Sequence, residues 1–168
     1  TSAADVVYTI EMQQHSSVAS TRQGDVDAVV SVQALDSMTV EVKLNRTGTA
    51  TLNSLLEVVP VPKHLLDSIP PERMRFAAFN NRPVGNGLYR FVRWTKGQET
   101  VLEANRDASP RASLDRIIVR VVPDPSGRLT ALINGEGDLD KIPADQRARL
   151  QATPNVRLHN AARVRPGW

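Results

Sequence analysis

Few residues of this chain have the types and spacing that catalysis or metal binding requires. The three histidines, His15, His64 and His159, are far apart in the sequence and lack the i, i+4 spacing of a helical metal-binding pair. The sequence contains no nucleophile-elbow serine, no phosphate-loop lysine motif and no zinc-protease helix motif. We therefore expect no catalytic residues, no metal site and no bound cofactor.

The most informative stretch is residues 83–91, a proline followed by Gly85-Asn86-Gly87 and then a segment with Tyr and Phe. Glycine and asparagine tolerate a positive φ at little steric cost, so the backbone here can bend sharply and approach another group closely. The two glycines also match the first half of a dinucleotide-binding fingerprint, but the pattern after them is that of a strand and not a helix. This context excludes a nucleotide loop and predicts a turn that starts a strand.

Composition and charge set the broad class. The chain has 168 residues, of which 40% are hydrophobic, so it can bury one core or two small ones. It has no cysteine, and it has no apolar run of the roughly 20 residues that span a bilayer. Residues 1–84 carry a net charge of −2 and residues 85–168 a net charge of +5, and arginine supplies most of the excess. These arginines alternate with apolar residues without a recognisable motif, so we expect no nucleic-acid binding. The lack of a long apolar run leads us to expect no membrane insertion.

The elements predicted in the first half are a capped helix, a hairpin and several short helices. Ser2 and Asp5 form an acidic variant of the capping box at the start of a helix. Val30, Val32 and Ala34 alternate with polar residues, and residues 40–44 alternate in the same way, which predicts a β-hairpin with one buried face. Short helices are predicted at residues 51–57 (with Leu52, Leu55 and Leu56 inward), 63–68 and 71–79.

The second half has the rhythm of an α/β layer. Residues 88–94 and 100–104 predict another hairpin, turned at Lys96-Gly97. Residues 117–122 are apolar on both faces, as in a strand that is covered on both sides. The remaining predicted elements are a helix at 125–133, a short strand at 138–140, a helix at 144–152 and a strand at 156–159.

Five segments of the chain form an ordered set of short motifs: residues 1–9 (TSAADVVYT), 32–42 (VQALDSMTVEV), 59–65 (VPVPKHL), 83–89 (PVGNGLY) and 134–138 (NGEGD). With these motifs in this order, the chain resembles a family 5 extracellular solute-binding protein, the peptide-, oligopeptide- and nickel-binding component of bacterial ABC importers. Leu88 stands where the family's glycine turn usually has proline, and residues 105–109 lack the aromatics of the matching family segment.

The resemblance implies a mixed α/β fold, a fragment of the periplasmic-binding-protein type II fold. Residues 1–80 would be a small extra domain built from a helix, a β-hairpin and short helices. Residues 81–168 would be part of the first main α/β lobe. Family members are much longer, so we expect this chain to lack the N-terminal strands and the second lobe, as a processed product or a fragment.

The function that the resemblance implies is capture of peptides or other small solutes for delivery to a membrane permease. The parent protein would be periplasmic or extracellular, lipid-anchored in a Gram-positive organism, and would not be an enzyme. A surface left uncovered by the missing lobe would favour self-association. The alternative is a folding or protein-interaction module that is derived from this scaffold without transport.

The same resemblance places the ligand cleft between two lobes. The candidates for lining the retained wall are Gly85, Asn86 and Gly87, whose backbone amides would meet a ligand or the opposite lobe. Arg82 is a further candidate, as a partner for a carboxylate. The other interpretation of this turn is that it only starts a strand and binds no ligand.

Overall fold

The computed structural model describes residues 1–159, which form a mixture of helices and strands in two compact units. The first unit is Thr1–Val119 and the second is Arg120–Trp168. The two units meet between residues 119 and 120. The boundary predicted at residue 80 is of another kind, because it separates domains of the longer proteins that the chain resembles, and the division into units does not test it. The predicted domain boundary therefore stays a prediction.

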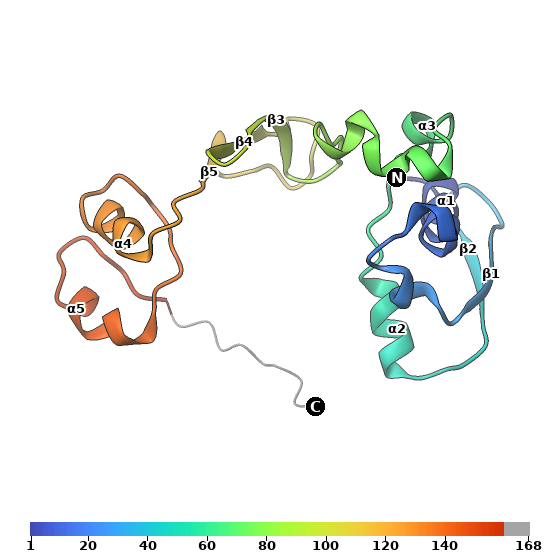
Figure 1. Cartoon of the computed structure of the whole chain (residues 1–168), viewed down its shortest axis with the longest axis horizontal. Helices are drawn as coiled ribbons and strands as arrows, with labels where there is room; N and C mark the ends of the chain where they lie inside the picture. The colour runs from blue at the N-terminus through green and yellow to red at the C-terminus, as the bar shows by residue number, and fades with distance from the viewer. Residues whose placement is uncertain (160–168) are drawn as a thin grey trace. The chain divides into compact units, whose positions relative to one another are not determined.

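The first unit is organised around helix α1, Ala3–Gln14, which begins where the capping signal predicts (Figure 1). The backbone N–H of Ser2 donates to Asp5 Oδ2 at 2.8 Å, and the Ser2 hydroxyl lies 3.1 Å from the same oxygen. Ala3, Tyr8, Thr9 and Ile10 are buried on the face of α1 that contacts the rest of the unit. The predicted capped helix is confirmed.

Two polar side chains of α1 hold a distant segment of the chain. The Thr9 hydroxyl accepts a hydrogen bond from the Val61 backbone N–H at 2.9 Å and donates to Asp5 O at 2.7 Å. Asp5 Oδ1 accepts from the Lys63 backbone N–H at 2.9 Å. Pro60 and Pro62 keep this segment extended, so its N–H groups cannot be satisfied within a helix and are bonded by α1 instead.

The predicted hairpin forms from β1 (Val29–Ala34) and β2 (Val40–Leu44), which pair antiparallel with Val32 opposite Val42. The predicted buried face is wrong at Val30 and at Ala34, which are both exposed, whereas Val32 between them is half-buried. The register shifts between Val29 and Ser31, so Val29 is buried and Val30 is 65% exposed. A bulge adds one residue to a strand and reverses the facing of those on one side of it, and alternation alone does not show where it falls.

Two small cores stabilise the first unit. Ile10, Val26 and Val29 form one, between α1 and the hairpin, and Tyr8, Leu66 and Ala77 form the other. The short helices around these cores are η1 (Ser16–Val18), η2 (Gln23–Val26), α2 (Thr49–Leu56), α3 (Lys63–Leu66), η3 (Pro71–Phe76) and η4 (Ala78–Asn80).

Only part of the predicted inward face of α2 packs. Leu55 contacts the core that contains Ile10, whereas Leu52 and Leu56 are 56% and 82% exposed. Thr51, Ser54 and Leu55 are half-buried and have the i, i+3, i+4 spacing of one helix face, so Leu52 and Leu56 lie outside that face. The prediction that all three leucines face inward is therefore wrong for Leu52 and Leu56.

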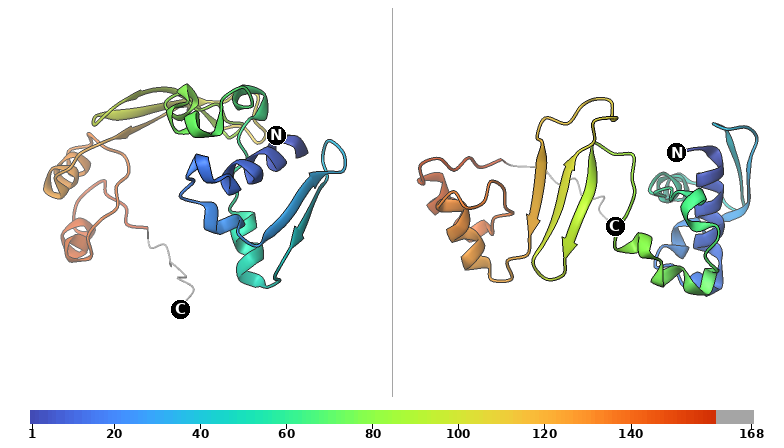
Figure 2. Two further views of the ribbon diagram at one scale, coloured as in Figure 1. Left: turned by 45° about the vertical axis from the view of Figure 1, so that its right-hand side comes forward. Right: turned by 90° about the horizontal axis from the view of Figure 1, so that it is seen from above.

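A three-stranded sheet completes the first unit, in the order β3-β4-β5 (Figure 2). β3 (Tyr89–Thr95) and β4 (Glu99–Ala104) form the predicted hairpin, and Gly97 in its turn has a φ of 73°, which favours glycine. β5 (Arg116–Arg120) adds the third strand. Ile118 and Val119 are 46% and 54% exposed, so residues 1–159 do not cover β5 on both faces as predicted.

In the second unit, α4 (Pro125–Ile133) begins at Asp124, whose Oδ2 accepts from the Gly127 N–H at 2.6 Å. The helix ends before Gly135, which has a φ of 74°, as predicted. The predicted helix at 144–152 forms as η5 (Ala144–Gln146) followed by α5 (Arg147–Gln151), and Leu150 is fully buried.

The strands predicted at 138–140 and 156–159 do not form. Leu139 is 92% exposed, and no neighbouring strand within residues 120–159 pairs with either segment. A strand exists only with a hydrogen-bonding partner, and local alternation cannot supply one. Within residues 1–159, every helix is too short or too polar to cross a membrane.

The contact between Thr9 and Val61 generates a stability prediction. Thr9→Val keeps the side-chain shape but leaves the Val61 N–H without an acceptor at a site where Thr9 is 2% exposed. We expect a loss of about 1–3 kcal/mol in the free energy of unfolding, measured by urea denaturation. Thr47→Val, at an exposed position, is the control and should change stability little. Equal stability of the two variants would contradict the role assigned to Thr9.

The hydrogen bonds to Asp5 generate a pH prediction. The backbone N–H groups of Ser2 and Lys63 lower the pKa of the Asp5 carboxyl, because they stabilise its charged form. A lowered folded-state pKa contributes stability above the unfolded-state pKa of about 3.9, and this stability is lost as the pH falls through the folded-state pKa.

Asp5→Ala should therefore destabilise the protein by about 1 kcal/mol at neutral pH, and the difference from the native sequence should shrink below about pH 4. Denaturation over a pH series measures it. Asp107→Ala removes an exposed carboxylate to which no hydrogen bond is made within residues 1–159 and serves as the control. A difference that is independent of pH would refute the electrostatic account.

Candidate functional site

The turn that contains the predicted site residues lies between η4 and β3 and is exposed throughout residues 83–88. It forms without a left-handed backbone, since Gly85, Asn86 and Gly87 all lack a positive φ. A Cβ added at Gly85 would meet no atom within 4 Å, and one at Gly87 would meet only Tyr89 O at 4.0 Å. Neither backbone geometry nor packing within this chain requires glycine at these two positions.

Hydrogen bonds hold the turn from two sides. Asn86 Nδ2 donates to Thr1 Oγ1 at 2.8 Å, which ties the turn to the residue before α1. Asn105 Nδ2 donates to Gly87 O at 3.0 Å, and the Asn105 backbone N–H donates to Leu88 O at 2.8 Å. Asn105 follows β4 directly, so it continues the β3–β4 pairing by one residue and fixes the carbonyl side of the turn.

The N–H side of the turn is unused. Within residues 1–159, the backbone N–H groups of Gly85, Asn86 and Gly87 donate no hydrogen bond. These three consecutive N–H groups are exposed, and two of the three residues are glycines without a side chain. A carbonyl or carboxylate oxygen can therefore approach the N–H groups closely. The structure thus brings together three of the four predicted site residues, with their amides free.

Arg82, the fourth, is placed differently. Its backbone N–H bonds to Ala78 O and Phe79 O at the end of η4, which fixes the main chain before the turn. Its side chain is exposed, and within the described residues no hydrogen bond or ion pair joins it to the turn.

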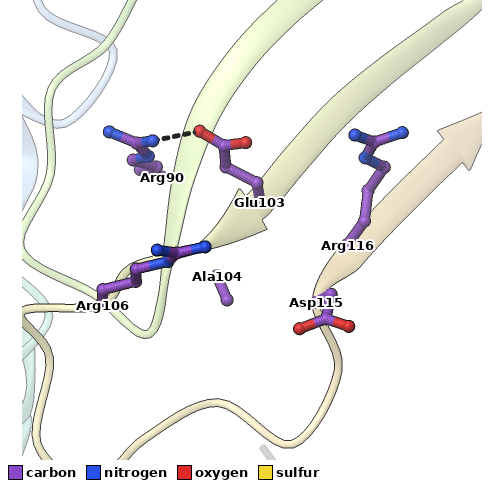
Figure 3. Close-up of a pocket in the computed structure, with 6 residues that line it drawn as sticks. All are labelled: Arg90, Glu103, Ala104, Arg106, Asp115 and Arg116. Atoms are coloured by element: carbon purple, nitrogen blue, oxygen red, sulfur yellow. Dashed lines mark ion pairs between the residues drawn. The ribbon is translucent and has the colours of Figure 1, made fainter.

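Sequence reasoning missed a second feature, an open hollow of about 550 Å³ on the β3–β4–β5 sheet (Figure 3). Its lining residues come from three separate segments of the sequence, and each segment on its own indicates only a solvated strand face or loop. Arg90 and Glu103 face each other across β3 and β4 and form an ion pair at 2.5 Å. The lining residues are Arg90, Glu103, Ala104, Arg106, Asp115 and Arg116.

His15, Asp36 and Asp27 have structural roles elsewhere in the chain. His15 Nδ1 accepts from the Ser17 N–H at 3.3 Å and caps η1. The N–H groups of Met38 and Thr39 lower the pKa of Asp36, and the Arg46 guanidinium lowers that of Asp27. Among residues 1–159, no group of three or more His, Asp or Glu side chains is arranged to hold a metal ion.

Comparison with known proteins identifies the class. The sequence model of the bacterial extracellular solute-binding proteins, family 5 Middle, matches residues 1–168, which is the whole chain. The chain therefore belongs to this family, as its sequence segments predict, and by the family's description its members are extracellular solute-binding proteins.

Two relatives show the match in sequence. A protein of Brucella ovis, named as an ABC transporter peptide-binding protein, is 31% identical over 134 residues, or 79% of this chain and 25% of the relative. The oligopeptide-binding protein AppA of Bacillus subtilis is 28% identical over 159 residues, or 93% of this chain and 29% of the relative. The chain thus spans between a quarter and a third of the length of these relatives.

Two solved structures show the match in fold. AppA of Bacillus subtilis, in complex with a nonapeptide, superposes with a TM-score of 0.87 at 26% identity and covers 92% of this chain and 31% of that one. NikZ of Campylobacter jejuni, in complex with Ni(L-His), superposes with a TM-score of 0.83 at 29% identity over the same shares. The predicted mixed fold, part of a type II periplasmic binding protein, is confirmed.

Proposed function

We propose that this chain is part of the substrate-binding component of an ABC-type peptide importer, and that it helps to capture peptides or similar small solutes for a membrane permease. The observation that carries the proposal is the family match over all 168 residues. The superposition on AppA with a TM-score of 0.87 supports it, because the matched fold then extends over 92% of the chain.

Peptides are the ligand class that the relatives favour. Both sequence relatives are named for peptide or oligopeptide binding, and they match 79% and 93% of the chain. NikZ, which is in complex with Ni(L-His), has the same fold over the same share of this chain. Since the ligand differs between proteins of one fold, the side chains and loops at the site must select it.

The proposed ligand-contacting residues are Gly85, Asn86 and Gly87, with Arg82 beside them. The three free N–H groups of the turn support this proposal, as do two glycines that the chain itself does not require. A glycine in open space costs conformational entropy without a structural return, and a close approach by another group is one of the uses that explains it. Arg82 supplies an exposed guanidinium that suits a ligand carboxylate.

The wider assignment follows the family. The protein acts as a binder and not as an enzyme, on the outer side of the membrane, with a lipid anchor if the organism is Gram-positive. Residues 1–80 form the small extra domain of such a binder and residues 81–168 part of its first main lobe. The ligand is enclosed when a second lobe closes on this one by hinge motion.

This assignment also explains the apolar residues on the sheet. Val92, Trp94, Ile118 and Val119 are between 40% and 54% exposed, although they belong to strands of regular geometry. Exposed apolar side chains on regular strands suit contact with another part of a protein. We propose that further parts of a two-lobed binder cover these residues, and that a second copy covers them when the chain is isolated.

Calorimetry with short peptides tests the function. The product of the complete open reading frame that contains this sequence should bind peptides, and this chain alone should bind them weakly, because half a cleft cannot enclose a ligand. Gly85→Val should weaken binding by that product at least tenfold by blocking the approach to the turn amides, while its free energy of unfolding stays the same. Gly24→Val, at another open position, is the matched control. Absence of peptide binding by the complete product would refute the peptide assignment.

Sedimentation of the isolated chain tests the apolar surface. Self-association should increase with protein concentration, and Trp94→Gln should reduce it because the tryptophan is 47% exposed on β3. Met38→Gln, which changes an 82% exposed residue in the turn between β1 and β2, should leave it unchanged. A monomer at all concentrations would rule out this surface as a contact between copies.

A further inference from the structure

The sequence contains two Asn-Gly pairs, Asn86-Gly87 and Asn134-Gly135. An asparagine before a glycine is chemically labile, because glycine has no side chain to keep its backbone nitrogen away from the side-chain amide of the asparagine. All four residues are exposed, so burial does not distinguish the two pairs. They differ in the hydrogen bonding of the glycine N–H.

The Gly87 N–H has no acceptor to hold it. Within residues 1–159 it donates no hydrogen bond, and Gly87 lies outside the helices and strands. A Cβ added at Gly87 would meet only Tyr89 O, at 4.0 Å, so the space around this residue is open. Asn86 Nδ2 donates to Thr1 Oγ1 at 2.8 Å, but both residues are exposed, so water can replace this partner.

The corresponding groups of Asn134-Gly135 are fixed at the end of a helix. The Gly135 N–H donates to Leu132 O at 3.2 Å, and the Glu136 N–H donates to Ala131 O at 2.8 Å, which closes the last turn of α4. Gly135 has a φ of 74°, the left-handed conformation that suits the residue after a helix. The Gly135 nitrogen could react only after this turn had opened, and such local opening costs free energy.

We propose that Asn86 is a site of spontaneous deamidation, and that the end of α4 protects the same pair at Asn134. The Gly87 backbone nitrogen attacks Asn86 Cγ and forms an N–C bond that closes a five-membered succinimide. The side-chain amide leaves as ammonia, which takes the proton that the Gly87 nitrogen gives up. Water then opens the ring at either carbonyl and gives aspartate or isoaspartate, so water is the only co-reactant and no electrons are transferred.

The reaction changes the turn in two ways. Either product replaces a neutral amide by a carboxylate, which adds a negative charge at neutral pH and removes the donor that Asn86 offers to Thr1. Isoaspartate in addition passes the main chain through its own Cβ, which lengthens the backbone before Gly87. The inference concerns the covalent chemistry of this chain and does not depend on the proposed role in peptide import.

Incubation of the folded chain at neutral pH, followed by digestion and tandem mass spectrometry, tests the proposal. Fragment ions assign each gain in mass to a particular asparagine. Asn86 should convert at least tenfold faster than Asn134. In guanidinium chloride that unfolds the chain, the two rates should agree within about threefold, because neither glycine N–H is then held. Equal rates in the folded chain, or a difference that persists unchanged in denaturant, would overturn the proposal.

Variants of the two glycines beside Asn86 test the chemical route. Gly87→Ala should slow the conversion at least fivefold, because a methyl group crowds the attacking nitrogen, and this position has no left-handed backbone to strain. Gly85→Ala is the matched control at an equally open position and should keep the rate within twofold. Isoaspartate should form together with aspartate, because direct hydrolysis of the amide gives aspartate alone. Equal rates in the two variants, or aspartate without isoaspartate, would refute the succinimide route.

Discussion

The first unit depends on the hydrogen bonds that Asp5 and Thr9 of α1 make to the segment at Val61 and Lys63. A chain segment with a proline at every second position cannot satisfy its own N–H groups, and these two acceptors satisfy them from a helix 52 and 58 residues earlier. The same helix buries Ile10 against the hairpin and Tyr8 against α3 and the residues after it. One helix thereby joins two small cores, neither of which is large enough to hold the unit alone.

Asn105 has a similar role at the other end of the unit. Its side chain holds the carbonyl of Gly87, and its backbone extends the pairing of β3 and β4 to Leu88. The turn is then fixed through its carbonyls while its amides stay free. Asn105 thus holds one side of the turn that we propose to bind a ligand.

The exposed apolar residues indicate that the surfaces of this chain are only partly covered. β5 has the composition of a strand buried on both faces, and yet Ile118 and Val119 are about half exposed. The matched proteins of the family are three to four times longer than this chain. Because the composition of a strand reflects everything that packs on it, their greater length offers a physical reason for the exposed apolar residues of β5. The hollow is the exception, because its charges suit water and not a packed partner.

The sequence by itself determined the local structure wherever a signal is local. The cap formed by Ser2 and Asp5, the turn at Gly97 and the helix end before Gly135 all formed as predicted, because each depends on φ preferences and hydrogen bonds within a few residues. The order of short motifs also determined the family. The predicted site is an intermediate case: the sequence located the turn, but the free amides of Gly85 to Gly87 became visible only with the hydrogen bonds around them.

Tertiary structure alone decided the features that depend on distant partners. The bulge at Val29 and Ser31 reversed one position of a regular alternation. The strands predicted at 138–140 and 156–159 did not form, because no strand among residues 120–159 pairs with them. The hollow is lined by residues from three separate segments, and only strand pairing brings these segments together. Local periodicity encodes which face of a segment is apolar, whereas the packed chain determines what, if anything, covers that face.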